Sequence, residues 1–294
     1  MKLNTGNRAF LTLMVVAVGG LVAAGMAACC VLGIVAYRVA TGGAGALSKN
    51  GIDPWATLVF VGVLATGSAL GVASLRRQLI GSRRLAARVR AARVEVPDAV
   101  AATATRCRLG RRVDVVEAQE AFSFTHGLAS PRVVVSTGLL DAVSAEELEA
   151  VLTHERYHVR NLDPLKVVLA RTLSAAVFYL PVLADLRGRY VAGRELAADR
   201  RSLRVHGERP LAGALYKVVR GPAWVDLGAA AAIGGGEALE ARVTQLETGA
   251  EPPLGQLSRS ALGASALGAG VFAWSGWASL APGAGVMAKL CSGR

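Results

Sequence analysis

Charged residues are scarce in this sequence. Aspartate, glutamate, lysine and arginine make up 18% of the 294 residues, whereas hydrophobic residues make up 53%. Soluble globular domains carry about 25% charged residues, and disordered chains combine low hydrophobicity with high net charge. The composition therefore excludes a disordered chain and argues against an ordinary soluble domain.

Charge is missing altogether from three stretches, residues 9–37, 54–75 and 260–288. Each stretch exceeds the roughly 18 residues that a membrane-spanning helix requires. We therefore expect an α-rich multi-pass membrane protein with about three transmembrane helices. Residues 1–28 also have features of a signal peptide, but apolar sequence continues to Tyr37, which favours a retained anchor.

Paired cysteines are also missing. The four cysteines lie at positions 29, 30, 107 and 291, and no two of them form a C-x-x-C motif. This distribution provides no framework of covalent cross-links, so we expect no disulfide bonds.

Acidic residues are fewer than basic ones, and the net charge is +12. Seven arginines lie within residues 76–93, directly after the second apolar stretch. A basic cluster at the end of a span marks the cytoplasmic side of a membrane, so residues from 76 onward are predicted to be cytoplasmic. No aromatic-rich recognition motif accompanies these arginines, so topology and lipid headgroups explain the cluster and no nucleic acid partner is expected.

Three short runs in the polar middle of the chain have the composition of strands. Residues 112–116, 122–125 and 132–135 are rich in β-branched and aromatic side chains, with Gly127 and Pro131 as turn formers between two of them. They predict a small antiparallel sheet.

Helix signals follow these runs. Ser144 and Glu147 form a capping-box pattern, and the helix that they open should end near residues 161–163, before Pro164. A second helix should follow Pro181, include residues 194–205 and end at Gly207. Residues 221–236 have the composition of a connector, and 237–246 that of a short amphipathic helix.

Two of the four histidines frame a glutamate in the pattern His154-Glu-x-x-His158. Residues i and i+4 share one face of a helix, so both imidazoles can bind one ion with Glu155 beside them. Zinc suits such a site because it accepts imidazole nitrogens and keeps a position for water. We predict His154 and His158 as metal ligands and Glu155 as the general base. Two chance histidines on a surface helix are the alternative.

Glu195 is the predicted third ligand. It shares a helix face with Asp199, which we expect to bind the second ring nitrogen of a histidine and so fix that ring's orientation. Asp163 competes for this second role, although helix termination explains an aspartate before proline equally well. An exposed face paired with neighbouring arginines is the alternative for Glu195 and Asp199.

No motif identifies the donor that would stabilise the transition state. His206 is one candidate because it follows Asp199 by seven residues on a similar helical face. Tyr157, Tyr190 and Arg194 are equally eligible, whereas His126 is expected to be an ordinary loop histidine.

The two halves of this site must lie on one side of the membrane. The uncharged stretch between His158 and Glu195 covers only residues 172–184, which is too short to span a bilayer. We therefore expect residues 165–184 to form a buried or membrane-surface helix, with both halves of the site cytoplasmic.

The pattern His154-Glu-x-x-His158 followed by Glu195-x-x-x-Asp199, framed by apolar stretches, resembles the membrane-embedded gluzincin metallopeptidases. These include the HtpX and CAAX-protease branch and the BlaR/MecR-type sensor peptidases. Residues 122–140 look like the segment before the zinc helix in the BlaR/MecR type, and the short interval to Glu195 favours that branch. The resemblance covers residues 110–205.

The resemblance implies an integral membrane zinc-dependent endopeptidase with one Zn²⁺ per chain. Its cytoplasmic α+β zincin-like domain would cleave a protein substrate, which pairs with a strand within residues 122–135. In sensor relatives such cleavage transmits a signal. The alternative from another class is a non-catalytic metal-binding membrane regulator or scaffold.

The expected organisation follows from these assignments. It comprises a two-span hairpin (1–75), a basic juxtamembrane segment (76–110), the metallopeptidase domain (111–220), a connector (221–258), and a C-terminal span with its tail (259–294).

Overall fold

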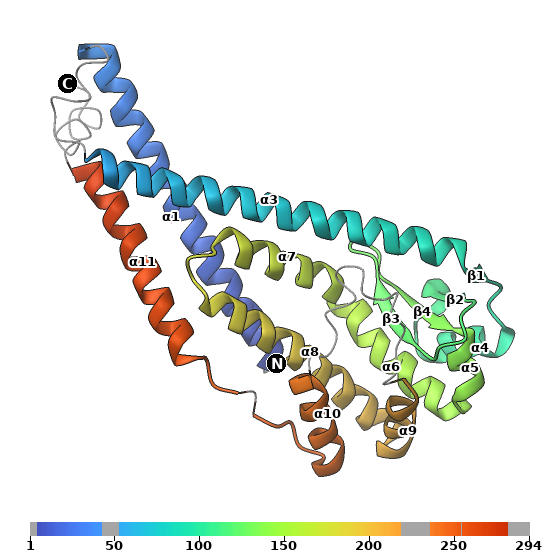
Figure 1. Ribbon diagram of the computed structural model, residues 1–294. Coiled ribbons are helices and arrows are strands. Elements are labelled where there is room, and N and C mark those ends of the chain that lie inside the picture. Colours follow the sequence, from blue (N-terminus) through green and yellow to red (C-terminus); the bar gives the residue numbers. More distant parts are fainter. Residues whose placement is uncertain (1–4, 43–52, 219–235, 254, 282–294) are drawn as a thin grey trace. The chain divides into compact units, whose positions relative to one another are not determined.

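The computed structural model describes residues 5–42, 53–218, 236–253 and 255–281 (Figure 1). The chain divides into two compact units, which we describe separately. Unit 1 comprises Met1–Leu11, Leu75–Arg171 and Arg187–Gln256, and unit 2 comprises Thr12–Ser74, Thr172–Leu186 and Leu257–Arg294. The predicted connector at 221–236 lies outside the described residues except for Gly236.

Long apolar helices dominate unit 2. Helices α1 (Thr5–Gly42) and α3 (Pro54–Ala91) have 38 residues each and are long and apolar enough to cross a membrane. Among the described residues no other helix meets both criteria. Helix α11 (Arg259–Leu280) begins at the third apolar stretch, so a third span stays a prediction.

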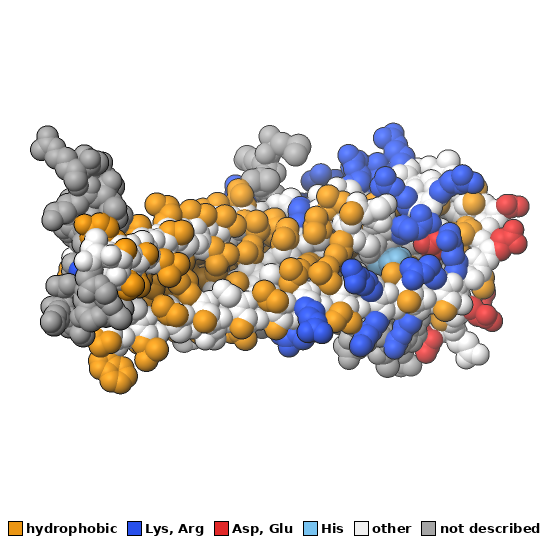
Figure 2. Space-filling view, turned by 90° about the horizontal axis from the view of Figure 1, so that it is seen from above, with side chains coloured by type: hydrophobic (Ala, Val, Ile, Leu, Met, Phe, Trp, Pro, Cys, Tyr) orange, Lys and Arg blue, Asp and Glu red, His pale blue; other side chains and the backbone are white. Residues whose placement is uncertain are grey.

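Aromatic stacking joins elements within unit 2. The ring of Phe272 on α11 lies 5.2 Å from that of Phe60 on α3 and 5.0 Å from that of Tyr179. Other apolar side chains of these helices are exposed, with Val15 at 64% and Val72 at 66%. On the face drawn in Figure 2, hydrophobic side chains cover the apolar helices, whereas lysine and arginine side chains gather over unit 1.

Unit 1 contains a four-stranded sheet in the order β1-β2-β4-β3. The strands are β1 (Arg93–Val94), β2 (Val113–Val116), β3 (Ser123–His126) and β4 (Arg132–Ser136). The three predicted strands are present, but the prediction of a purely antiparallel sheet is wrong, because β2 and β4 are parallel. The hairpin that turns at Gly127 places β4, not β3, beside β2, and leaves β3 at the edge.

Both faces of the sheet are covered. Val133 and Val135 of β4 point into a core shared with Leu152 of helix α6 (Ala145–Asn161), whereas Val134 points to the opposite face. There it packs in a cluster with Leu85 and other apolar side chains from the end of α3. Burial on both faces explains why residues 133–135 read as an uninterrupted apolar run.

Helix α6 (Ala145–Asn161) begins at the predicted capping box. The hydroxyl of Ser144 accepts a hydrogen bond from the Glu147 N–H, and the Glu147 carboxylate accepts one from the Ser144 N–H. The helix ends at Leu162, which has a left-handed backbone with φ of 54°, and α7 (Asp163–Ala176) starts at the next residue. The predicted helix at 165–184 is therefore shorter than expected.

Helix α8 (Val182–His206) follows Pro181 and ends at Gly207, as predicted. Helix α9 (Glu208–Val218) was not predicted, because Pro210 signals an end to a helix. Pro210 instead occupies the first turn of α9, where its missing N–H breaks no intrahelical hydrogen bond. The predicted short helix is α10 (Gly236–Thr248).

The remaining described elements of unit 1 are short. Helix α4 (Asp98–Arg106) and the 3-10 helix η1 (Gly110–Arg112) connect β1 to β2, and α5 (Thr137–Ala142) follows β4. None of them was predicted.

Candidate metal centre

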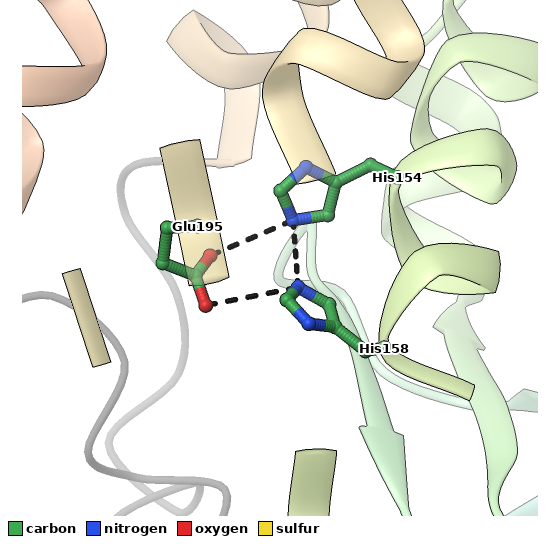
Figure 3. A group of neighbouring side chains, drawn as sticks. All are labelled: His154, His158 and Glu195. Atoms are coloured by element: carbon green, nitrogen blue, oxygen red, sulfur yellow. Dashed lines mark hydrogen bonds and ion pairs between the residues drawn. The ribbon is translucent and has the colours of Figure 1, made fainter. Parts of the chain in front are cut away.

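Three side chains from two helices converge at the centre of unit 1 (Figure 3). Helix α6 supplies His154 and His158, whose Nε2 atoms are 3.1 Å apart. Helix α8 supplies Glu195, whose Oε2 lies 3.5 Å from His154 Nε2 and whose Oε1 lies 3.7 Å from His158 Nε2. All three side chains are buried.

These separations fit a tetrahedral metal ion. Bonds of about 2.0–2.1 Å from zinc to its ligands place neighbouring ligand atoms about 3.3 Å apart. The observed separations, from 3.1 to 3.7 Å, lie near this value, with a different Glu195 oxygen nearest to each histidine. In addition, Glu195 Oε1 is buried and makes no well-aligned hydrogen bond with the described residues, although Arg194 Nε lies 3.2 Å from it. A buried carboxylate whose two oxygens each face one imidazole suits a bound cation.

A separate carboxylate contacts the second ring nitrogen of each histidine. His158 Nδ1 lies 2.7 Å from Asp163 Oδ2, at the start of α7. His154 Nδ1 lies 2.8 Å from Asp199 Oδ1, although this contact is not aligned as a straight hydrogen bond. A proton shared with a carboxylate at Nδ1 leaves the lone pair on Nε2, where a metal binds. The two aspartates that the sequence analysis weighed against each other each contact one histidine.

Burial and charged neighbours shift the pKa values of the ionisable side chains in the centre. Burial alone would lower the pKa of His154, but its contacts with Asp199 and Glu195 outweigh burial and raise that pKa to about 9. Burial alone would raise the pKa of Glu195, yet the charge of His158 and of nearby arginines holds it well below its usual value. The pKa of Asp199 is lowered in the same way, chiefly by Arg242. Both carboxylates are therefore anionic, as metal binding requires, whereas a metal that binds His154 would displace a proton from its ring.

Glu155 lies beside the centre and is held by the edge strand β3. Its Oε1 accepts a hydrogen bond from Ser123 Oγ at 3.0 Å, and its Oε2 accepts one from Thr125 Oγ1 at 2.7 Å. Residues i and i+2 share one face of a strand, which explains why both hydroxyls reach one carboxylate. Neither residue is predicted as part of the site from the sequence, although both are hydroxyl side chains at alternate positions of a predicted strand.

One cavity joins these groups. Its polar lining contains both histidines, Glu155, Glu195 and the two β3 hydroxyls, and its apolar wall comes from α6, α7 and α9. The apolar residues are Val151, Pro164, Leu211, Ala214 and Leu215. Arg194 and Arg242 also line the cavity. The cavity thus offers a binding wall next to the candidate metal ligands.

The structure does not bring His206 to this cavity. Its Nε2 lies 2.8 Å from Thr153 Oγ1, and its ring lines a separate depression at the start of α9. His206 is therefore absent from the described lining of this cavity, and its role as a donor stays a prediction. Seven residues keep His206 on a face similar to that of Asp199, but they also move it about 10 Å along the helix axis.

The other candidate donors differ in position. Tyr190 donates a hydrogen bond from its hydroxyl to Asp163 Oδ1 at 3.0 Å and is fully buried. Arg194 lines the cavity, whereas Tyr157 is not among the described residues that do so. His126 ends β3 rather than lying in a loop, and burial lowers the pKa of its ring.

Comparisons with known proteins agree with this geometry. The model of the BlaR1 peptidase M56 family matches residues 48–246. Protease HtpX homolog 2 of Methanosarcina mazei is 41% identical over 71 residues, which is 24% of each chain. The protease HtpX homolog of Aquifex aeolicus is 35% identical over 70 residues, covering 24% of this chain and 23% of that one.

A longer match is the protease HtpX homolog of Methanothermobacter thermautotrophicus, 29% identical over 123 residues, or 34% of this chain and 48% of that protein. The chain therefore spans between a quarter and a half of the length of these curated relatives. The predicted resemblance is confirmed at the level of the family. The chain belongs to the BlaR1 peptidase M56 family, and over part of its length it is similar to the protease HtpX homologs.

Proposed function

We propose that this chain is a zinc-dependent endopeptidase that cleaves a protein substrate at the cytoplasmic face of the cell membrane. In this proposal His154, His158 and Glu195 hold one Zn²⁺. The observation that carries it is the convergence of three buried ligand atoms within 4.8 Å of one another, on a chain of a peptidase family.

The residues around the centre have distinct tasks in the proposed reaction. A zinc ion held there would lower the pKa of a bound water from about 15.7 to about 7 and polarise the scissile carbonyl. Glu155 would accept a proton from water and later deliver a proton to the departing amine. Ser123 and Thr125 hold the Glu155 carboxylate, and Asp163 and Asp199 keep the histidine rings in place.

The substrate is proposed to bind in an extended form along β3. This strand is at an edge of the sheet, so one side of its backbone pairs with no other described strand. An extended peptide can add to such an edge through main-chain hydrogen bonds. The adjacent apolar wall from α9, with Leu211 and Leu215, would receive an apolar side chain of that peptide.

The membrane topology is part of the proposal. The arginines that follow the apolar part of α3 favour a cytoplasmic position for unit 1. We propose α11 as a third span, and the division of the chain into five segments remains as predicted from the sequence. On the BlaR/MecR resemblance we also propose that this cleavage transmits a signal.

The substitution Glu155→Gln tests the proposal. It removes the general base but keeps the side-chain shape, so the purified protein should retain its zinc while cleavage of a dye-labelled casein falls by about 10²- to 10⁴-fold. Glu146→Gln makes the same change at an exposed position of α6 and should leave cleavage unchanged. His154→Ala should lose the zinc.

Two results would contradict the proposal. If the Glu155→Gln protein cleaves as the original does, Glu155 is not the base. If the unchanged protein binds zinc but cleaves neither casein nor any protein in a proteomic comparison of expressing cells, the metal-binding regulator or scaffold is the better description.

A further inference from the structure

Arg242 connects a fourth helix to the candidate metal centre. It lies on α10, whereas the three ligand side chains lie on α6 and α8. Its Nε donates a hydrogen bond to Asp199 Oδ2 at 2.7 Å, and its Nη2 donates one to Asp199 Oδ1 at 2.9 Å. Its Nη1 lies 3.8 Å from Glu195 Oε2.

The guanidinium fixes the orientation of the Asp199 carboxylate. Two parallel N–H donors hold both oxygens of a carboxylate in one plane, which a single donor does not do. Asp199 Oδ1 contacts both Arg242 Nη2 and His154 Nδ1, so rotation of the carboxylate would break both contacts at once. The Asp199 side chain is fully buried, and water cannot replace a lost partner there without cost.

Other contacts keep α10 in place. Gln245 Nε2 donates a hydrogen bond to the Leu196 carbonyl oxygen on α8 at 2.9 Å, and the Gln245 side chain is buried. Arg200 of α8 also pairs with Glu251, three residues after the end of α10. These contacts hold α10 against α8. The Arg242–Asp199 pair is therefore not a loose surface contact.

We propose that Arg242 is a positioning residue of the metal centre, which acts through Asp199 on His154, and that α10 thereby completes the site. The sequence analysis assigned residues 221–258 to a connector. This inference rests on the proposed function, because it concerns the same zinc site. It states that Arg242, which lies outside the two helices that carry the ligands, contributes to the affinity for the metal.

Zinc affinity measured on the full-length protein in detergent tests the inference. Competition with a chromogenic chelator gives the zinc dissociation constant of each variant. Arg242→Gln should raise that constant by about 10- to 100-fold, as for other groups that orient a ligand. Arg242→Lys should recover part of the loss, since lysine keeps the charge but not the two-pronged geometry. Arg204→Gln removes an exposed arginine of α8 and should change nothing.

Two further variants separate positioning from folding. Gln245→Ala cuts one anchor of α10 without touching Asp199, and it should weaken zinc binding less than Arg242→Gln does. In the background of Asp199→Asn, Arg242→Gln should add less than a two-fold further loss, because both changes remove the same support for His154.

The outcomes distinguish this inference from the proposed function. If the unchanged protein binds zinc and cleaves casein while Arg242→Gln binds zinc equally tightly, the inference is overturned and the function stands. The inference also fails if Gln245→Ala reproduces the full effect, or if the two losses multiply in the double variant. A protein that binds no zinc in its original form overturns both.

Discussion

At the scale of single residues, the candidate site is built from pairs in which one side chain fixes another. Each histidine has its own aspartate, and Tyr190 in turn donates a hydrogen bond to Asp163. Glu155 has two hydroxyl donors from one strand. A carboxylate that must approach water in one orientation gains from such donors, because they hold it without neutralising it.

Thr125→Val tests the support of Glu155. Valine has nearly the shape of threonine but lacks the hydroxyl that reaches Glu155 Oε2. We expect kcat for casein to fall by about 10-fold, which corresponds to about 1.4 kcal/mol, with KM and zinc content little changed. Thr125→Ser keeps the hydroxyl and should restore most of kcat. A valine variant with the original kcat would show that the hydrogen bond has no part in turnover.

Single residues also show which parts of the site can be predicted from the sequence. The positions of His154, His158, Glu195 and Asp199 follow from spacings of four residues within single helices, and such spacings are visible in the sequence. Arg242 contacts Asp199 but lies 43 positions after it in the sequence, and no local periodicity predicts that contact. A spacing of seven residues predicts that His206 shares a helical face with Asp199, but it also separates the two along the helix axis.

At the scale of elements, the sheet depends on one buried acidic residue. Asp114 on β2 pairs with Arg93 on β1 and with Arg132 on β4, with N–O distances of 2.6 Å in both pairs. The carboxylate thereby joins three neighbouring strands. Burial alone would raise the pKa of Asp114, but the hydrogen bonds and charge of Arg132, with the charge of Arg93, lower it.

This clamp predicts a pH-dependent stability. Because the folded-state pKa of Asp114 lies below the unfolded value of about 3.9, its stabilisation is present above that value and is lost as pH falls through the folded pKa. Asp114→Asn should therefore destabilise unit 1 by about 1–3 kcal/mol at pH 7, and by progressively less as the pH falls below about 3.9.

Thermal melting of both proteins in detergent across this pH range measures the difference. Asp141→Asn makes the same change at an exposed position and serves as the control. A loss of stability that is as large at pH 3 as at pH 7 would show that the charge of Asp114 is not responsible.

The helices and strands also show which features of the fold are determined by neighbouring residues in the sequence. Ser144 and Glu147 announce the start of α6 because the capping box satisfies N–H groups within one turn. The parallel pairing of β2 with β4 depends on which strands meet in space, and the strand composition does not encode that choice. Pro210 predicts the end of the preceding helix, but it also fits the first turn of α9, because proline is tolerated in the first turn of a helix.

At the scale of the whole molecule, a metal would link parts of the chain that lie far apart in the sequence. The residues that would bind or orient it come from α6, α7, α8 and α10. Ligands that bind only the folded state stabilise it, by about 2.7 kcal/mol at a concentration 100 times the dissociation constant.

Removal of zinc should therefore lower the melting temperature of the protein. Calorimetry before and after dialysis against a chelator measures the change, and added zinc should reverse it. Glu155→Gln should show the same shift as the original protein, whereas His154→Ala should show none. An original protein that melts identically with and without chelator would argue against a bound ion in the folded state.

The spread of supporting groups over four helices has a consequence for damaged copies of the protein. Detachment of any one of these helices would take away an imidazole, a carboxylate or a group that steers one of them. The cation would then escape before the chain had unravelled. Proteolytic activity would be lost before complete unfolding. A partly denatured copy would therefore stay in the bilayer without cleaving neighbouring proteins.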